Sequence, residues 1–211
     1  MFDHALTLIA SWNAFAELGV FATVSLLLAT LRTRMQHAET LALSDPLTGL
    51  ANRRALIAAL SWERERTSRT GLPFTLAYRD LDGFEQLNDR PGHAEGDHVL
   101  SVTARTLHAR LRQLDLAARL GGDEFALLLP ETDLAGAREL IVSLHAELLT
   151  AMAAGRWGIT LSVGVLTVLP GAAHVQELLS RADAVMYECK RAGKNVVRFA
   201  ELGGELVEEA Q

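Results

Sequence analysis

Two carboxylates directly follow a pair of glycines near the middle of the chain. The stretch Arg119–Pro130 reads RLGGDEFALLLP, so Asp123 and Glu124 stand between Gly121-Gly122 and an apolar, strand-like run. Adjacent glycines suit a tight hairpin, because both can adopt a positive φ without a Cβ clash. Carboxylates at the mouth of such a turn can hold a hard cation such as Mg²⁺. From these letters alone, an ordinary hairpin with solvated acids is the alternative.

A second acidic turn is expected earlier in the chain. Asp80 and Asp82 lie two residues apart where the predicted strand 74–81 ends. If this strand end lies beside the hairpin, Asp80, Asp82 and Asp123 converge, and triphosphate oxygens and water can complete an octahedral Mg²⁺ site. Taken without other support, paired acids at turns are more often solvated than bound to a metal.

The run Gly-Gly-Asp-Glu-Phe is the signature of the GGDEF family of diguanylate cyclases, and the chain resembles this family over roughly residues 42–200. The other matching segments occur in the family's order: DPLTGLANRR at 45–54, RDLDGF at 79–84, LND at 87–89, GH at 92–93, GD at 96–97, SVGV at 162–165, RADAVMY at 181–187, Lys190, and GKN at 193–195. Several ordered motifs are stronger evidence than a five-residue signature.

The resemblance implies which residues hold the metal and assist the chemistry. Asp80, the backbone carbonyl of Leu81, and Asp123 are implied to bind Mg²⁺, or Mn²⁺ in its place. Asp123 is also implied to activate the attacking hydroxyl, with Glu124 beside it as a second candidate catalytic acid. The duty of Asp82 stays open.

Guanine recognition is expected from Asn88 and Asp97. Their amide and carboxylate complement the donors and acceptors of a purine edge, and a carboxylate that accepts from the ring N–H and the exocyclic amine selects guanine over adenine. His93 is expected to support the same pocket, and a purely structural histidine in the 92–96 loop is the alternative.

Lysines and glycines are implied to accommodate the triphosphate. Lys190 and Lys194, four residues apart near a helix end, are expected at the β- and γ-phosphates, while Gly121 and Gly122 leave room for the α-phosphate. For lysines on a surface helix the usual state is solvation, and only the family pattern favours phosphate binding here.

The implied reaction joins two GTP molecules into cyclic di-GMP and releases two pyrophosphates. One domain holds one GTP, so two copies of the chain must meet as a homodimer. Arg112 and Asp115 match the family's inhibitory Arg-x-x-Asp site, where arginine can grip the product bidentately and aspartate can accept from guanine. A plain surface ion pair is the alternative for this short pattern.

Two residues depart from the family pattern. Glu85 stands where the family usually has a lysine that neutralises phosphate charge, and Arg79 stands where it favours an apolar strand residue. Arg79 is a candidate for the missing positive charge, although adjacent strand residues point to opposite faces. A catalytically weak domain that binds GTP or cyclic di-GMP for signalling is therefore the competing hypothesis.

The N-terminal stretch 5–31 carries one formal charge, Glu17, and is followed by Arg32 and Arg34. As a helix it would be about 40 Å long, enough for a bilayer core of about 30 Å. The arginines suit the cytoplasmic side, which predicts a cytoplasmic catalytic domain anchored to the inner membrane. An amphipathic signalling or dimerisation helix is the alternative.

The elements that position these residues follow from hydrophobic period and turn signals. Helices are predicted at 52–69, 95–114, 134–152 and 175–191, with strands at 74–81, 158–168 and 195–199 beside the hairpin. The first helix is expected to bury Leu56, Leu60 and Trp62. This alternation predicts an α/β sandwich of ferredoxin or polymerase-palm type, and the resemblance implies the same nucleotidyl-cyclase fold.

Composition limits the alternatives. The 211 residues are 49% hydrophobic and 22% charged, which predicts a globular chain. The expected layout is an N-terminal helix and linker at 1–44, a GGDEF domain at 45–200 and an acidic, solvated tail at 201–211. A formal charge of −6 argues against nucleic-acid binding, and a single cysteine excludes an internal disulfide.

Overall fold

The computed structural model describes residues 18–30, 32, 43–89, 94–171, 174–202 and 209–210. The chain divides into two units, Met1–Ala42 and Leu43–Gln211. In the first, residues 18–30 are helical with exposed side chains. Within the described ranges, no helix combines the length and apolarity needed to cross a membrane. Since residues 5–17 and 31 of the expected span lie outside those ranges, the membrane helix stays a prediction.

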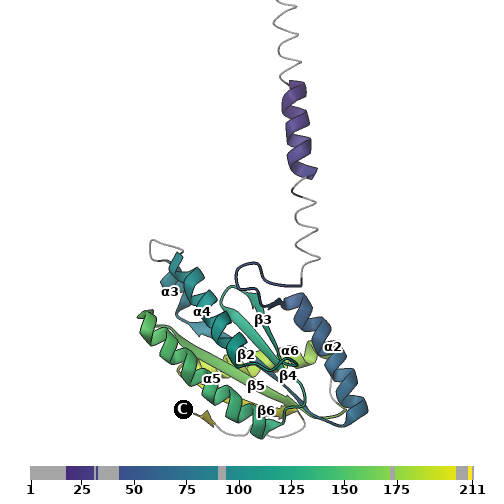
Figure 1. Cartoon of the computed structure of the whole chain (residues 1–211), viewed down its shortest axis with the longest axis vertical. Coiled ribbons are helices and arrows are strands. Elements are labelled where there is room, and N and C mark those ends of the chain that lie inside the picture. The colour runs from purple at the N-terminus through teal and green to yellow at the C-terminus, as the bar shows by residue number, and fades with distance from the viewer. Residues whose placement is uncertain are drawn as a thin grey trace, which may run out of the picture. The chain divides into compact units, whose positions relative to one another are not determined.

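A seven-stranded mixed sheet forms the centre of the second unit, in the spatial order β1-β3-β4-β2-β5-β6-β7 (Figure 1). The strands are β1 (Ala51–Asn52), β2 (Phe74–Asp82), β3 (Leu116–Gly121), β4 (Glu124–Leu129), β5 (Thr160–Val168), β6 (Val197–Leu202) and β7 (Glu209–Ala210). The central pairs β3–β4, β4–β2 and β2–β5 are antiparallel, whereas β5 and β6 are parallel.

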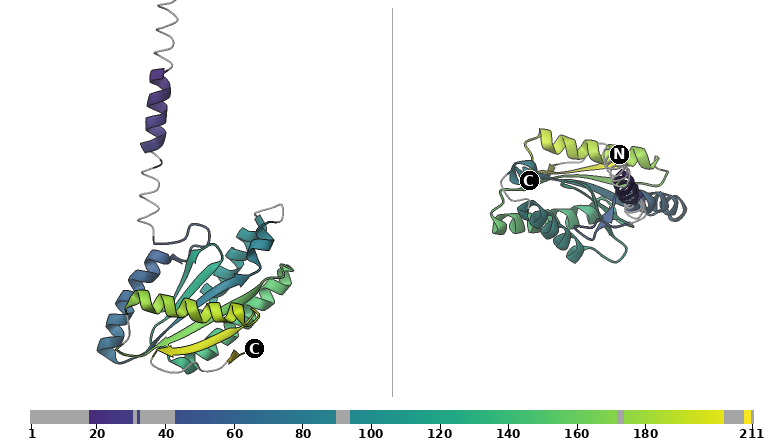
Figure 2. Two further views of the ribbon diagram at one scale, coloured as in Figure 1. Left: turned by 180° about the vertical axis from the view of Figure 1, so that it is seen from behind. Right: turned by 90° about the horizontal axis from the view of Figure 1, so that it is seen from above.

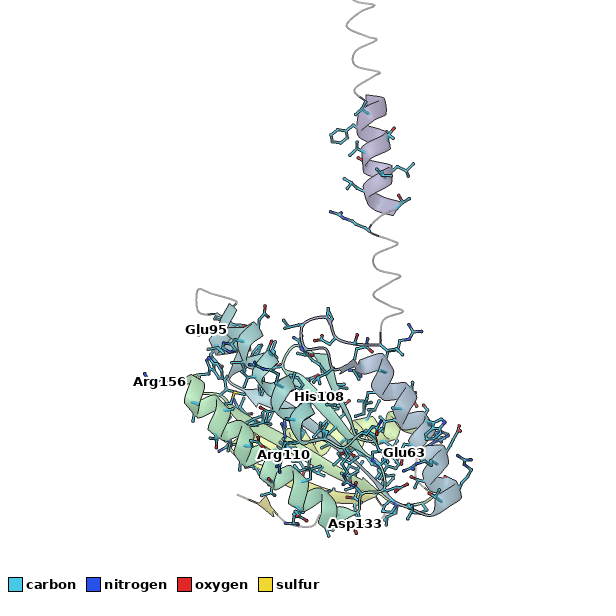
Figure 3. All side chains as sticks on the ribbon, viewed as in Figure 1. Glu63, Glu95, His108, Arg110, Asp133 and Arg156 are labelled. Atoms are coloured by element: carbon cyan, nitrogen blue, oxygen red, sulfur yellow. The ribbon has the colours of Figure 1, made fainter. Side chains whose placement is uncertain are left out.

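In the described part of this unit five helices alternate with the strands: α2 (Arg53–Thr70), α3 (Phe84–Asn88), α4 (Ala94–Arg110), α5 (Leu134–Gly155) and α6 (Val175–Arg191). Polar caps set two of their starts. The Asn52 side chain accepts from Ala55 N at 3.0 Å, and Asp133 accepts from Gly136 N at 2.8 Å. Figure 3 labels Asp133 at the start of α5 and Arg156, its C-cap, at the other end.

The sheet separates two apolar layers. Seen from above in Figure 2, α6 covers one face of the sheet, and α4 and α5 cover the other. Alternation along β2 decides which layer a residue joins: Leu76 and Tyr78 pack on the α6 side, whereas Ala77 and Leu81 pack on the α4–α5 side. The sandwich predicted from the sequence is therefore the observed architecture.

Local predictions hold for most elements and fail at a few. The prediction that Trp62 is buried in the core is wrong, because the residue is 62% exposed. Helix α4 ends at Arg110 rather than at 114, and the short helix α3 and strand β1 were not expected. The end of the expected solvated tail also differs: residues 201–202 extend β6, and residues 209–210 pair with Val197 and Arg198.

Candidate functional site

A cavity of about 480 Å³ lies where β2 ends beside the β3–β4 hairpin. It gathers most of the residues that the sequence singled out: Asp80, Leu81, Asp82, Glu85, Asn88, Gly122, Asp123, Lys190 and Lys194. These residues come from three separate stretches of the chain, 80–88, 122–123 and 190–194. The antiparallel pairing of β2 with β4 sets Asp80 opposite Glu124, so Asp123 in the turn lies beside the end of β2.

The hairpin has the backbone expected of a Gly-Gly turn. Gly121 has a φ of 144° and Gly122 a φ of 52°, values that L-residues with a side chain rarely adopt. A β-bulge between Arg119 and Gly121 accompanies the turn. The tight turn brings Asp123 to the cavity with no side chain at Gly122 in the way.

Asp80, Asp123 and Lys190 form a charged cluster in the cavity. Lys190 Nζ donates to Asp80 Oδ2 at 2.7 Å, and Asp80 is only 6% exposed. Burial, and secondly the charge of Asp80, raise the pKa of Asp123. For Lys190 burial alone would lower the pKa, but the hydrogen bond and the charge of Asp80 outweigh it and the pKa is raised. The cluster thus holds excess negative charge that one lysine only partly offsets.

The donor set fits a hard divalent cation that also binds phosphate. Two carboxylates and the carbonyl-bearing backbone of Leu81 line the cavity, and oxygen is the ligand that Mg²⁺ prefers. After burial, the charge of Asp80 is the second cause of the raised pKa of Asp123, so a cation between the two carboxylates would offset their repulsion. In the ranges that the structure describes, no group of three or more His, Cys, Asp or Glu side chains could hold a metal ion alone. Substrate oxygens or water would therefore have to complete the coordination.

Asp82 has a structural role that its sequence position did not reveal. Its carboxylate accepts hydrogen bonds from Thr160 Oγ1 at 3.0 Å, from Ser162 Oγ at 2.9 Å and from the backbone N of Asn195 at 3.1 Å. Asp82 therefore joins β2 to β5 and to the loop that follows α6. That loop carries Lys194, whose φ is 66°.

Glu124 does not share the cavity with Asp123. Its side chain lines a second cavity of about 370 Å³ together with Arg53, Tyr78 and Asp183. Asp123 belongs to the turn, whereas Glu124 is the first residue of β4 and is oriented by the strand. The expectation that both acids serve the same reaction centre is thus not supported by their placement.

The predicted guanine-binding residues are only partly brought together. Asn88, at the end of α3, lines the cavity, and a Cβ added at Gly96 would overlap its Oδ1. Glycine at 96 therefore leaves room for the Asn88 side chain. Asp97, the next residue, is exposed in the first turn of α4 and does not line the cavity. His93 lies outside the described residues.

The two departures from the family pattern have different environments. Glu85 is exposed in the first turn of α3 and lines the cavity. The hypothesis that Arg79 supplies positive charge to the triphosphate is wrong. Arg79 lies on the face of β2 opposite to Asp80 and is only 2% exposed. Its three guanidinium nitrogens have no hydrogen-bond partner among the described residues, and burial lowers its pKa to about 9. Burial and the charge of Arg79 also lower the pKa of His145 to about 4.

Arg112 and Asp115 lie in the turn before β3, outside the cavity. Asp115 Oδ2 accepts from Arg112 N at 2.8 Å and lies 3.7 Å from Arg112 Nε. The Asp115 side chain is 1% exposed, but the Arg112 side chain is 65% exposed and free to contact another molecule. The aspartate thus fixes the turn that presents the arginine.

One supporting residue had no role assigned from the sequence. Arg119 bonds both Asp45, in the segment that enters the domain, and the carbonyl of Gly122 in the hairpin. The available signal was its position two residues before the glycine pair, with an acid at the start of the DPLTGL motif.

Comparison with known proteins agrees with this geometry. Residues 42–196 match the family described as diguanylate cyclase, GGDEF domain. The chain is 41% identical over 162 residues to the diguanylate cyclase DgcP of Pseudomonas aeruginosa, covering 75% of this chain and 24% of that protein. It is 35% identical over 172 residues to the response regulator PleD of Caulobacter vibrioides, covering 79% and 38%. The chain therefore spans well under half the length of these two relatives.

Solved structures show the same architecture. The coiled coil and GGDEF domain of DgcB from Caulobacter crescentus, in complex with c-di-GMP, aligns with a TM-score of 0.69 at 29% identity, covering 85% of this chain and 97% of that one. The diguanylate cyclase SiaD of Pseudomonas aeruginosa, in complex with its activator SiaC, aligns with a TM-score of 0.68 at 35% identity, covering 94% and 79%. With most of the domain matched in sequence and in fold, this chain belongs to the GGDEF domain family.

Proposed function

We propose that the chain is a diguanylate cyclase that joins two GTP molecules into cyclic di-GMP and releases two pyrophosphates. The observation that carries this proposal is the convergence of Asp80, Asp123, Lys190 and Lys194 in one cavity that also contains Asn88. Acids suited to a divalent cation and lysines suited to phosphate are the groups that phosphoryl transfer requires. Membership of the GGDEF family supports the same activity.

Each group in the cavity has a separable duty under this proposal. Lys190 and Lys194 hold the β- and γ-phosphates, and Asn88 holds the guanine with help from Asp97 and His93. Lys190 would exchange part of its contact with Asp80 for phosphate. Asp123, at the turn beside Asp80, accepts the proton of the attacking 3′-hydroxyl. Asp80, the Leu81 carbonyl and Asp123 are the groups that would hold a divalent cation, which would supply positive charge at the phosphates.

The geometry of the reaction requires two copies of the chain. A cavity of about 480 Å³ suits one nucleotide, so the second GTP must come from another domain that faces the first. The 3′-hydroxyl of each GTP then attacks the α-phosphorus of the other, and pyrophosphate leaves in line. We therefore propose a catalytic homodimer, with residues 1–44 as an N-terminal helix and linker that regulates or anchors the domain at 45–200 on the cytoplasmic face of the inner membrane.

A catalytically weak GTP- or cyclic di-GMP-binding domain is the second candidate, because Glu85 lines the cavity. A carboxylate there repels a triphosphate unless a cation lies between them. The deciding experiment measures product from GTP and Mg²⁺ by chromatography and mass identification, for the parent chain, Asp123→Ala and Glu85→Lys. Cyclic di-GMP from the parent but not from Asp123→Ala supports the cyclase. Product only from Glu85→Lys favours the binding domain.

We further propose feedback inhibition through Arg112 and Asp115. The exposed guanidinium of Arg112, held by the buried Asp115, can grip a phosphate or a guanine edge of the product. Arg112→Ala should leave the initial rate unchanged and raise the final yield of cyclic di-GMP. Arg105→Ala is the control, because Arg105 is an exposed arginine on α4. Equal inhibition of the parent and Arg112→Ala by added cyclic di-GMP would exclude this site.

A further inference from the structure

The second cavity, about 370 Å³, lies on the α6 side of the sheet and has no role in the proposed chemistry. Its wall contains Arg53 at the start of α2, Glu124 at the start of β4 and Asp183 on α6, with Tyr78 of β2 among them. Arg53 and Asp183 are exposed at the rim, whereas Tyr78 is only 5% exposed. The cavity thus combines one cation and two acids around a buried phenol.

These polar groups are not paired with one another or with other residues that the structure describes. Among the described residues, Arg53, Glu124 and Asp183 make no ion pair, and the hydroxyl of the buried Tyr78 makes no hydrogen bond. The charges of all three nevertheless act on Tyr78, whose pKa is raised mainly by burial. Because Arg53 and Asp183 are exposed and unpaired across the cavity, charged groups of another molecule can pair with them.

The second cavity is close to the surface that the reaction must cover with a partner domain. Asp183 in this cavity and Lys190 in the first are seven residues apart on α6, so they lie almost two full turns, or about 10 Å, apart on one side of the helix. Asp123 and Glu124 connect the two cavities again at the hairpin. A domain that faces the first cavity can therefore also reach the second.

We infer that Arg53 of each copy enters the second cavity of the other copy and pairs with its Asp183 and Glu124 in the catalytic dimer. An interface around a two-fold axis must be self-complementary, and a rim with one arginine opposite two acids meets that condition. The occupant is thus a second copy of this chain, and Arg53 is a positioning residue that aligns the two GTP-binding cavities. This inference rests on the proposed function, since it needs two facing domains.

Charge reversal tests the pairing between copies. Arg53→Glu places like charges at both symmetry-related contacts, and so does Asp183→Arg, so each variant alone should lose at least about tenfold in rate. When the two variants are mixed, a dimer can form from one copy of each. At one of its contacts, the acid introduced by Arg53→Glu then faces the base introduced by Asp183→Arg, so opposite charges meet again. The second contact of that mixed dimer keeps Arg53 opposite Asp183. The equimolar mixture should therefore regain about half of the parent rate or more, because at least half of its dimers are mixed.

The experiment uses the full chain with GTP and Mg²⁺ and follows both product formation and dimerisation by sedimentation velocity. The matched controls are Arg69→Glu at the other end of α2 and Glu139→Arg on α5, both exposed residues outside the two cavities. These controls should keep the parent rate. The double variant Arg53→Glu/Asp183→Arg in one chain should also recover activity and dimerisation.

Three outcomes would overturn the inference. Full activity in either single variant would show that the contact is not used. Recovery in the double variant without recovery in the mixture would show that Arg53 and Asp183 pair within one chain. If neither the double variant nor the mixture recovers activity, the lower rates of the single variants have another cause, such as loss of a small ligand from the cavity. A parent chain that makes no cyclic di-GMP contradicts the proposed function instead, and sedimentation of the same mixtures then still decides the pairing.

Discussion

The guanidinium of Arg119 joins Asp45 to the hairpin turn. Its Nη1 lies 3.2 Å from both carboxylate oxygens of Asp45, and its Nη2 donates to the Gly122 carbonyl at 2.8 Å. Asp45 also accepts from Thr48 N and Oγ1. One side chain thus connects the segment that enters the domain to Gly122, the residue beside Asp123.

Replacing Arg119 should reduce activity more than stability. Arg119→Met removes the hydrogen bonds to Asp45 and to the Gly122 carbonyl but keeps the side chain's length, so we expect a loss of about 1–2 kcal/mol in the free energy of unfolding and at least about a tenfold loss in rate. Urea unfolding and initial rates measure the two effects. Arg105→Met, at an exposed position on α4, is the control. A variant as active as the parent would show that the hairpin needs no such support.

Asp123→Asn should stabilise the domain while it abolishes activity. The pKa of Asp123 is raised above 3.8 by burial and by Asp80, so the folded state favours the protonated form. At pH values above the raised pKa, the ionised carboxylate lowers the free energy of unfolding. This destabilisation decreases as the pH falls through the raised pKa toward 3.8. Thermal melts without metal should give Asp123→Asn a higher Tm than the parent at pH 7, with a smaller gap near pH 4.5. A lower Tm at pH 7 would contradict this assignment.

Loss of the Asp82 carboxylate should destabilise the fold. Asp82→Ala leaves the hydroxyls of Thr160 and Ser162 and the backbone N–H of Asn195 without their acceptor. Hydrogen bonds to a charged group contribute about 1.5–3 kcal/mol each, so a total loss of about 3 kcal/mol or more is expected in urea unfolding. Asp89→Ala, in the turn after α3, is the matched control. An unfolding free energy equal to that of the parent would show that the three donors find other acceptors.

Arg79→Met should make the domain more stable. The buried guanidinium has no partner among the described residues, and a pKa of about 9 leaves it charged at neutral pH. Methionine has a similar length without that charge, so we expect a gain of about 1–3 kcal/mol in the free energy of unfolding at pH 7. A destabilised but folded variant would show that the charge is compensated in solution.

The same substitution should change the titration of His145. Its pKa of about 4 is depressed mainly by burial and further by Arg79. Because folding depresses this pKa, His145 lowers stability progressively as the pH falls from about 6.5 to 4. In Arg79→Met the imidazole resonances followed by NMR should titrate at higher pH than in the parent. An unchanged midpoint would show that burial alone sets the value.

Local sequence patterns predicted the elements but not every side chain's direction. The Gly-Gly hairpin and the helix at 175–191 depend on neighbours in sequence, and the structure confirms them. Strand alternation also indicated that Arg79 and Asp80 point to opposite faces, which counted against Arg79 as a phosphate-binding cation. The sequence did not predict that Asp123 and Glu124 line different cavities. Strand alternation gives no direction for Asp123, because this residue lies in the turn before β4.

Other parts of the site depend on contacts between distant segments. The hydrogen bonds of Asp82 reach residues 78 to 113 positions later, and no local period encodes them. Resemblance to the GGDEF family named the residues of the first cavity, but it assigned no role to Arg53 or Tyr78. The second cavity could not be predicted from the sequence, because its walls come from α2, β4 and α6, which are far apart in the chain.

The only cysteine in the sequence, Cys189, is fully buried on α6, and burial raises the pKa of its thiol to about 11. A thiol in that state reacts slowly with maleimides and methanethiosulfonates. A single cysteine introduced on the surface would therefore accept a fluorophore or spin label selectively in an otherwise unaltered chain. Distances between two labelled copies could then be followed by spectroscopy during turnover.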